Sequence, residues 1–309
     1  MKRFGIVLIA VMLSGCGDTN PFTTAGDGDS TTTVIPDSIK GDLSKFTYNP
    51  TSGTLTVEGI TLDEVPFAAN YRRRAAMDVP GYQAYTAQDD PLDRHTTAFV
   101  AQSGNSGAVR AGVVVTGGLF NRYYGGGYYE RDGNFTPPTV TSTSGLVTYA
   151  GTYAGLTNVG GDGGDLLTVP AGTDSSLIPR DAGEVIGTVE LNVDFADNSL
   201  EGSIYNRSAP DGNIALPTII LVATTIATDG TFFGTTVEYE NNLDIDIGDY
   251  GGIFGGPNAE GVGGIVRLTE FDGDGNPLGF ENEEEYGVFV LNQCGTPDEA
   301  AAPCASVNP

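Results

Sequence analysis

Histidine and cysteine, two residue types that carry much enzyme chemistry, are scarce in this 309-residue chain. His95 is the only histidine, and no cysteine has a histidine close to it in the sequence. Any Ser-His-Asp or Cys-His mechanism would have to use this one imidazole, and the chain contains no Gly-x-Ser-x-Gly elbow. Haem ligation is an alternative role for His95, but a lone histidine is more typical of a structural or solvated position. We therefore expect no catalysis and no cofactor.

One acidic segment imitates a calcium-binding loop. Asp272, Asp274 and Asn276, with Glu283 at the twelfth place, follow the spacing of an EF-hand. The sixth place, which needs glycine for a sharp turn, holds Pro277. An ordinary turn is therefore the better interpretation, weak calcium binding is the alternative, and we predict no metal site.

The segment 122–131 has the composition of a recognition loop. Tyrosines and arginines flank three glycines in it, and rigid amphipathic rings supply contact area at low cost in entropy. The alternative is a hairpin whose tyrosines half-cover a sheet. The ligand-binding residues predicted from this segment are Arg122, Tyr123, Tyr124, Tyr128, Tyr129 and Arg131.

The chain begins with the pattern of an export signal. Two basic residues precede an apolar run, 4–13, which is shorter than the roughly 20 residues that span a bilayer as a helix. The run leads into Leu-Ser-Gly-Cys16, which resembles the lipobox of bacterial lipoproteins. This resemblance implies removal of residues 1–15 and acyl chains on the Cys16 thiol, and Gly17 in the next position favours the outer membrane. An ordinary secretory signal is the alternative.

The two remaining cysteines are Cys294 and Cys304. Export would place them in an oxidising compartment, so we expect them to form a disulfide. Closing so short a loop would stabilise the protein by roughly 2 to 3 kcal/mol. Zinc is the weaker alternative, because two thiols and one histidine cannot complete a four-ligand cage.

Charge limits the classes of partner. The formal net charge is −26 at pH 7, and a field of this sign repels phosphate backbones, so we expect no nucleic acid partner. Basic proteins or cations suit it better. The hydrophobic fraction of 39% is enough to bury a core.

The first part of the chain is expected to contain a tether and a small β domain. Residues 16–40 are rich in Thr, Asp, Gly, Ser and Pro, which favours a disordered tether with a reach on the order of 25 Å. Residues 41–140 are expected to form one smaller β-rich domain, and a helix at 62–77 stays undecided because Pro66 interrupts it. The strands predicted there cover residues 54–57, 83–87, 96–101, 109–116 and 120–129.

The second part predicts a β-barrel at 145–293, followed by a C-terminal tail at 294–309. Eight antiparallel strands are the number at which a sheet closes around an interior filled by side chains. Glycines within these strands indicate the bends of a tight barrel. A sandwich and a membrane-spanning barrel are alternatives. The eight predicted strands cover residues 147–156, 184–195, 199–206, 218–227, 231–239, 250–255, 261–270 and 285–292.

Three runs in this barrel resemble a known family. They are Tyr149-Ala-Gly-Thr-Tyr-Ala-Gly, the stretch Gly-Gly-Ile-Phe-Gly-Gly-Pro-Asn-Ala-Glu-Gly-Val-Gly-Gly at 251–264, and Tyr286-Gly-Val-Phe-Val. Their order and spacing resemble the barrel of the transferrin-binding protein B family, which includes factor H binding protein. The resemblance covers about 147–292. It implies an N-terminal handle domain in the place of 41–140 and a surface lipoprotein that binds a protein or an iron or haem carrier without catalysis.

Overall fold

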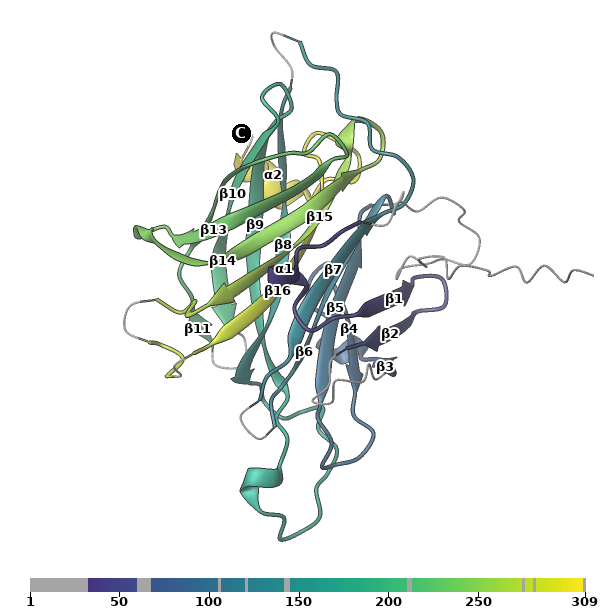
Figure 1. The fold of residues 1–309 in the computed structure, drawn as a ribbon, viewed down its shortest axis with the longest axis vertical. Coiled ribbons are helices and arrows are strands. Elements are labelled where there is room, and N and C mark those ends of the chain that lie inside the picture. Colours follow the sequence, from purple (N-terminus) through teal and green to yellow (C-terminus); the bar gives the residue numbers. More distant parts are fainter. Residues whose placement is uncertain are drawn as a thin grey trace, which may run out of the picture.

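The computed structural model describes residues 33–59, 68–104, 107–119, 122–141, 145–209, 213–273, 276–279 and 282–307. Within them the chain forms two antiparallel sheets, one seven-stranded and one closed into a barrel (Figure 1). Two short α-helices, α1 (Asp37–Lys40) and α2 (Ala301–Val307), and three 3-10 helices at Ala75–Met77, Ser175–Leu177 and Pro257–Ala259 complete the described structure. Among these residues, no helix has the length and apolar composition needed to cross a bilayer.

The barrel contains eight strands, each antiparallel to the next. The last strand pairs with the first, with Phe289 opposite Tyr153, and this pairing closes the sheet. A short strand, β11 (Ile214–Ala215), adds to the edge of one of them. The predicted antiparallel eight-stranded barrel is thus confirmed. Its strands are β8 (Leu146–Gly160), β9 (Ala182–Asp194), β10 (Ser199–Ala209), β12 (Ile219–Thr225), β13 (Thr231–Tyr239), β14 (Asn242–Gly255), β15 (Gly261–Thr269) and β16 (Glu284–Asn292).

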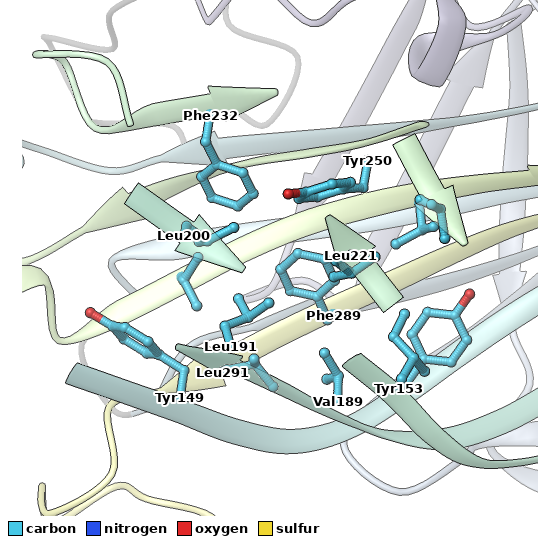
Figure 2. Packing of buried hydrophobic residues seen from close by; sticks show 14 of the residues in the cluster. Tyr149, Tyr153, Val189, Leu191, Leu200, Leu221, Phe232, Tyr250, Phe289 and Leu291 are labelled. Carbon is cyan, nitrogen blue, oxygen red and sulfur yellow. The ribbon is translucent and has the colours of Figure 1, made fainter. Parts of the chain in front are cut away.

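Side chains fill the interior of the barrel (Figure 2). Alternate residues point inward, as the two-residue period of a strand requires. In β9 these are Val185, Val189, Leu191 and Val193, all at most 1% exposed. Rings of Tyr149, Phe232, Tyr250 and Phe289 meet them from other strands in Figure 2. Burial of these apolar surfaces is the main source of stability for the barrel.

The seven-stranded sheet is a meander in which sequence neighbours pair. Strand β6, next to the edge strand β7, is buried on both faces, with Val113 packed toward the barrel and Val114 packed toward the first strands of the sheet. The sheet therefore has an apolar core on each side. Its strands are β1 (Lys45–Asn49), β2 (Thr54–Glu58), β3 (Ala68–Arg73), β4 (Gln83–Ala87), β5 (Thr96–Gln102), β6 (Val109–Thr116) and β7 (Gly125–Arg131).

A shared core joins the sheet to the barrel. Val113 and Val115 from β6 pack in one cluster with Ile265 from β15 and Val288 from β16. These barrel residues alternate with the inward-facing ones, so β15 and β16 are apolar on both faces. In Figure 1 the sheet accordingly lies along one side of the barrel.

The structure differs from two expectations in the first part of the chain and answers one question that the sequence left open. Of the expected tether, 16–40, the described residues 33–40 belong to the folded core, because Ile35 and Ile39 are 5% and 0% exposed and α1 packs between the sheet and the barrel. The segment 62–77, for which a helix was left undecided, forms strand β3 and a 3-10 helix in the part that the structure describes. The strand expected at 120–129 runs instead from Gly125 to Arg131.

Candidate binding surface

The tyrosine-rich segment does not form an exposed loop. Most of it is strand β7, which pairs with β6 and faces the barrel. Tyr129 is 1% exposed and Arg131 is 8% exposed. The Arg131 guanidinium donates hydrogen bonds to the carbonyls of Asp229, at 2.7 Å, and Phe254, at 2.9 Å, so it fastens the sheet to the barrel. The expectation that these two side chains bind a ligand is therefore corrected, because both are buried in the seam.

The three glycines of this segment allow close packing and not loop flexibility. A Cβ atom on Gly127 would lie 2.7 Å from Ile265 Cδ1, and one on Gly125 would lie 2.7 Å from the ring of Tyr286. Neither distance is compatible with a methyl group. The glycines therefore permit the barrel to approach the sheet backbone.

The remaining tyrosines of the segment differ in access. Tyr123 donates a hydrogen bond to the Leu156 carbonyl at 3.4 Å and packs against Tyr286, and burial holds its pKa well above the ordinary value. Tyr128 is half-buried, and desolvation raises its pKa to about 12.

The accessible part of the segment lies before β7. Arg122 is exposed and Tyr124 is half-buried. Arg94 stacks over the Tyr124 ring at 4.9 Å and donates a hydrogen bond to the Arg122 carbonyl at 3.0 Å. Of the six predicted ligand-binding residues, these two are the best placed to meet a partner.

His95 lies beside a cleft between the sheet and the barrel. The cleft has a volume of about 530 Å³ and is lined by Arg73 and Arg74 on the sheet side and by carboxylates, among them Asp165 and Asp181, on the barrel side. His95 is 1% exposed, and its Nε2 atom lies 3.0 Å from Asp165 Oδ2. Asp165 also pairs with Arg74. Burial, followed by repulsion from Arg74 and Arg72, lowers the pKa of His95 to about 4.

Arg74 and His95 on the seven-stranded sheet both contact Asp165, which follows the first barrel strand, so these residues link the sheet to the barrel. The neutral imidazole cannot offset the charge of Asp165, and Arg74 does so instead. Arg73 is paired with Asp78 at 2.5 Å. His95 and Asp165 lie in different parts of the chain, and their contact was not predicted from the sequence.

The barrel interior holds one buried ionic network. Arg207 and Glu285 have side chains that are 0% exposed, with Nη2 and Oε2 2.6 Å apart. Tyr153 donates a hydrogen bond to the other oxygen of Glu285 at 2.5 Å. Arg207 also donates to the Pro217 carbonyl at 3.0 Å and stacks over the Phe271 ring. The network satisfies both carboxylate oxygens without solvent, which favours a buried ion pair, while the buried Arg207 Nε has no hydrogen-bond partner among the described residues.

The predicted disulfide between Cys294 and Cys304 is present. It ties helix α2 to the end of the barrel, where α2 contacts β8 and β9, so part of the expected tail, 294–309, is folded. Cys16 lies outside the described residues. Asp272 accepts a hydrogen bond from the Leu278 amide at 3.1 Å and so holds a turn between β15 and β16, whereas Asp274 lies outside the described residues.

Comparisons with known proteins agree with this architecture. Residues 141–290 match the family model of the C-lobe and N-lobe beta barrels of Tf-binding protein B. These residues contain most of the closed barrel, which is therefore a transferrin-binding protein B-like barrel. A search of curated protein sequences found no match.

Several solved structures are similar to the chain. A double mutant of transferrin binding protein B from Haemophilus parasuis Hp5 has 12% identity and a TM-score of 0.37, covering 81% of this chain and 53% of that one. A mutant from Actinobacillus pleuropneumoniae H49 has 18% identity and a TM-score of 0.33, covering 63% and 80%. The isotype 1 protein from serogroup B Neisseria meningitidis has 17% identity and a TM-score of 0.34, covering 81% and 51%. The chain thus spans about half the length of the first and third.

Proposed function

We propose that this protein is a lipid-anchored binding protein of the outer membrane or cell surface, which recognises a protein or an iron or haem carrier without catalysis. One observation carries the proposal. The barrel is of the transferrin-binding protein B type and its interior is filled by packed side chains. A filled barrel has to use its outer surface and loops for recognition, and such surfaces suit a macromolecule better than a small enclosed ligand.

The ligand class rests on the names of the matching proteins. They are called transferrin binding proteins, so their named partner is an iron-carrying protein. For this chain we propose a partner of the same general kind, a protein, with carriage of iron or haem by that protein as the narrower form. The charge of −26 supports a partner with a basic surface.

The membrane anchor is proposed from the sequence around Cys16. Acyl chains on one terminus give stable membrane attachment when two or more are present. The Cys16→Ser chain should therefore be recovered in the soluble fraction. Continued association of this variant with membranes would contradict the anchor.

The recognition role is tested with the soluble Cys16→Ser chain as bait in the native growth medium. We expect one protein to be captured in stoichiometric amount and identified by mass spectrometry. Tyr124→Ala should weaken the capture more than Tyr205→Ala, a half-buried tyrosine on the outer barrel, because Tyr124 is an accessible aromatic side chain beside two arginines.

Two other outcomes would replace the proposal. A haem absorbance band or extractable lipid in the purified protein would favour a small-ligand carrier. Absence of any captured protein, haem and lipid would favour a structural lipoprotein of the envelope.

A further inference from the structure

The hairpin formed by β13 and β14 extends past the neighbouring strand of the barrel. The pairing of β14 with β15 begins at Gly248, opposite Leu268. Before Gly248, β14 pairs with β13 alone among the described residues, and the register shifts there, because Asp246 faces Glu238 whereas Asn242 faces Tyr239. In Figure 1 this hairpin projects outward from the barrel beside the labels β13 and β14. On the β15 side the Thr269 hydroxyl reaches the Ile247 carbonyl, and among the described residues 242–246 have no strand partner there, so this part of the edge can accept another chain.

Two large apolar side chains lie on this projecting segment. Leu243 is 56% exposed and Ile245 is 43% exposed. Both lie in the irregular part of the strand, where residues 243–245 have no partner in β13, and both side chains extend into solvent. The next residue in the series, Ile247, is 3% exposed and belongs to the barrel core. The apolar pattern of the core therefore continues into solvent, where it contributes nothing to the packing of the barrel.

Carboxylates surround these apolar side chains. Glu238, Glu240, Asp244 and Asp246 all lie in the hairpin, and the sequence has no Lys or Arg between Arg207 and Arg267. Those two arginines are already paired, Arg207 with Glu285 inside the barrel and Arg267 with Glu284.

The negative charge of the hairpin limits which molecules can bind to it. A second copy of this chain carries a net charge of −26, and an anionic membrane or a nucleic acid has the same sign, so all three are repelled. A protein segment with Lys or Arg beside its apolar side chains has the complementary pattern.

We propose that the β13–β14 hairpin is a docking site for an extended segment of a partner protein in which apolar side chains alternate with Lys or Arg. Such a segment would pair with the free edge of residues 242–246, cover Leu243 and Ile245, and place its cations beside Asp244 and Asp246. Strand addition of this kind takes its affinity from backbone hydrogen bonds and its specificity from alternate side chains. The proposal rests on the proposed binding function and names the chemistry of the partner.

The test uses the soluble Cys16→Ser chain and two fluorescent ten-residue peptides. One alternates lysine with valine, and the other alternates glutamate with valine. Fluorescence anisotropy should show saturable binding of the lysine peptide and no binding of the glutamate peptide. The affinity should fall as salt is raised, because the carboxylates are exposed to solvent.

Paired variants locate the binding. The double variant Leu243→Ser with Ile245→Ser should weaken binding of the lysine peptide by about tenfold or more. Burial of one large apolar side chain changes a binding constant by at least that factor. The matched control is Leu146→Ser, which removes a leucine that is 80% exposed at the start of β8. Equal melting temperatures show that the variants are folded.

A second pair tests the charge. Glu240→Gln with Asp244→Asn should weaken binding and flatten its salt dependence, whereas Glu201→Gln, on the exposed face of β10, should do neither. Absence of lysine-peptide binding to the parent chain, or equal binding to the hairpin variants, would overturn the docking site. If the hairpin variants still capture the partner from native medium, the docking site is wrong and the proposed function stands. If the peptide binds at the hairpin but no partner is captured, the proposed function fails.

Discussion

Replacing Glu285 by glutamine should be one of the most damaging single changes in the barrel. The substitution keeps the size of the side chain but leaves the Arg207 guanidinium without its counter-charge. Both side chains are 0% exposed and their charged atoms are 2.6 Å apart, so solvent cannot compensate. Breaking a buried pair from one side typically costs about 3 to 5 kcal/mol. We expect a loss of this size in the free energy of unfolding.

A double-mutant cycle separates the pair interaction from the cost of burial. Arg207→Met should also destabilise the barrel by about 3 kcal/mol or more, because it leaves the Glu285 carboxylate with Tyr153 as its hydrogen-bond donor. The double variant Glu285→Gln with Arg207→Met removes both charges from the interior. Its cost should therefore be well below the sum of the two single losses, by at least about 2 kcal/mol. Urea denaturation of the soluble Cys16→Ser chain at constant pH gives all four free energies.

The surface pair Arg267–Glu284 provides the matched control. Its side chains are 32% and 34% exposed and its charged atoms are 3.4 Å apart. Glu284→Gln should cost less than about 1 kcal/mol, since water screens a pair of this kind. Additive losses at Arg207 and Glu285, or a loss at Glu285 no larger than that at Glu284, would refute the account of the buried network.

Three further predictions concern the seams of the molecule. His95 has a pKa of about 4 in the folded protein and of about 6.5 in the unfolded chain, so between these pH values only the unfolded chain binds the additional proton. The free energy of unfolding should therefore fall by up to about 3 kcal/mol as the pH is lowered through this window. His95→Gln should flatten that fall in pH-dependent denaturation. Gly127→Ala should lower the free energy of unfolding by about 1 to 3 kcal/mol, because its Cβ would lie 2.7 Å from Ile265, while Gly160→Ala, where no atom other than chain neighbours comes closer than 3.5 Å, should cost less. Cys304→Ser should lower the free energy of unfolding by about 2 to 3 kcal/mol. In the denatured parent chain, a free-thiol assay that finds the same number of thiols before and after reduction would contradict the disulfide.

The barrel could be predicted because its information is local. Strands such as β9 alternate apolar and polar residues, and turn residues such as Asn198 and Gly230 adopt positive φ where the hairpins reverse. Two strands of the seven-stranded sheet were not predicted, β1 and β3; they are short, and their polar residues are held in place by pairing with neighbours. Pairing of this kind is a tertiary effect that local propensity does not record.

The tyrosine-rich segment shows why the surface could not be predicted equally well. Its composition is the same whether the rings face a partner or the protein itself. Tyr129 faces the barrel because β7 is the strand that lies in the seam, and this depends on how the sheet packs on β15 and β16.

The sequence by itself determined most of the strands, the closed barrel, the disulfide and the acidic character of the chain, because alternation, turn chemistry, cysteine number and charge are properties of neighbouring residues or of composition. Only the tertiary structure decided which faces are buried. It joined Arg207 to Glu285 and His95 to Asp165, packed the tyrosine-rich strand into the seam, and left Leu243 and Ile245 in solvent. The physical reason is that burial depends on contacts between residues far apart in the chain, and those contacts exist only once both sheets have formed and packed together.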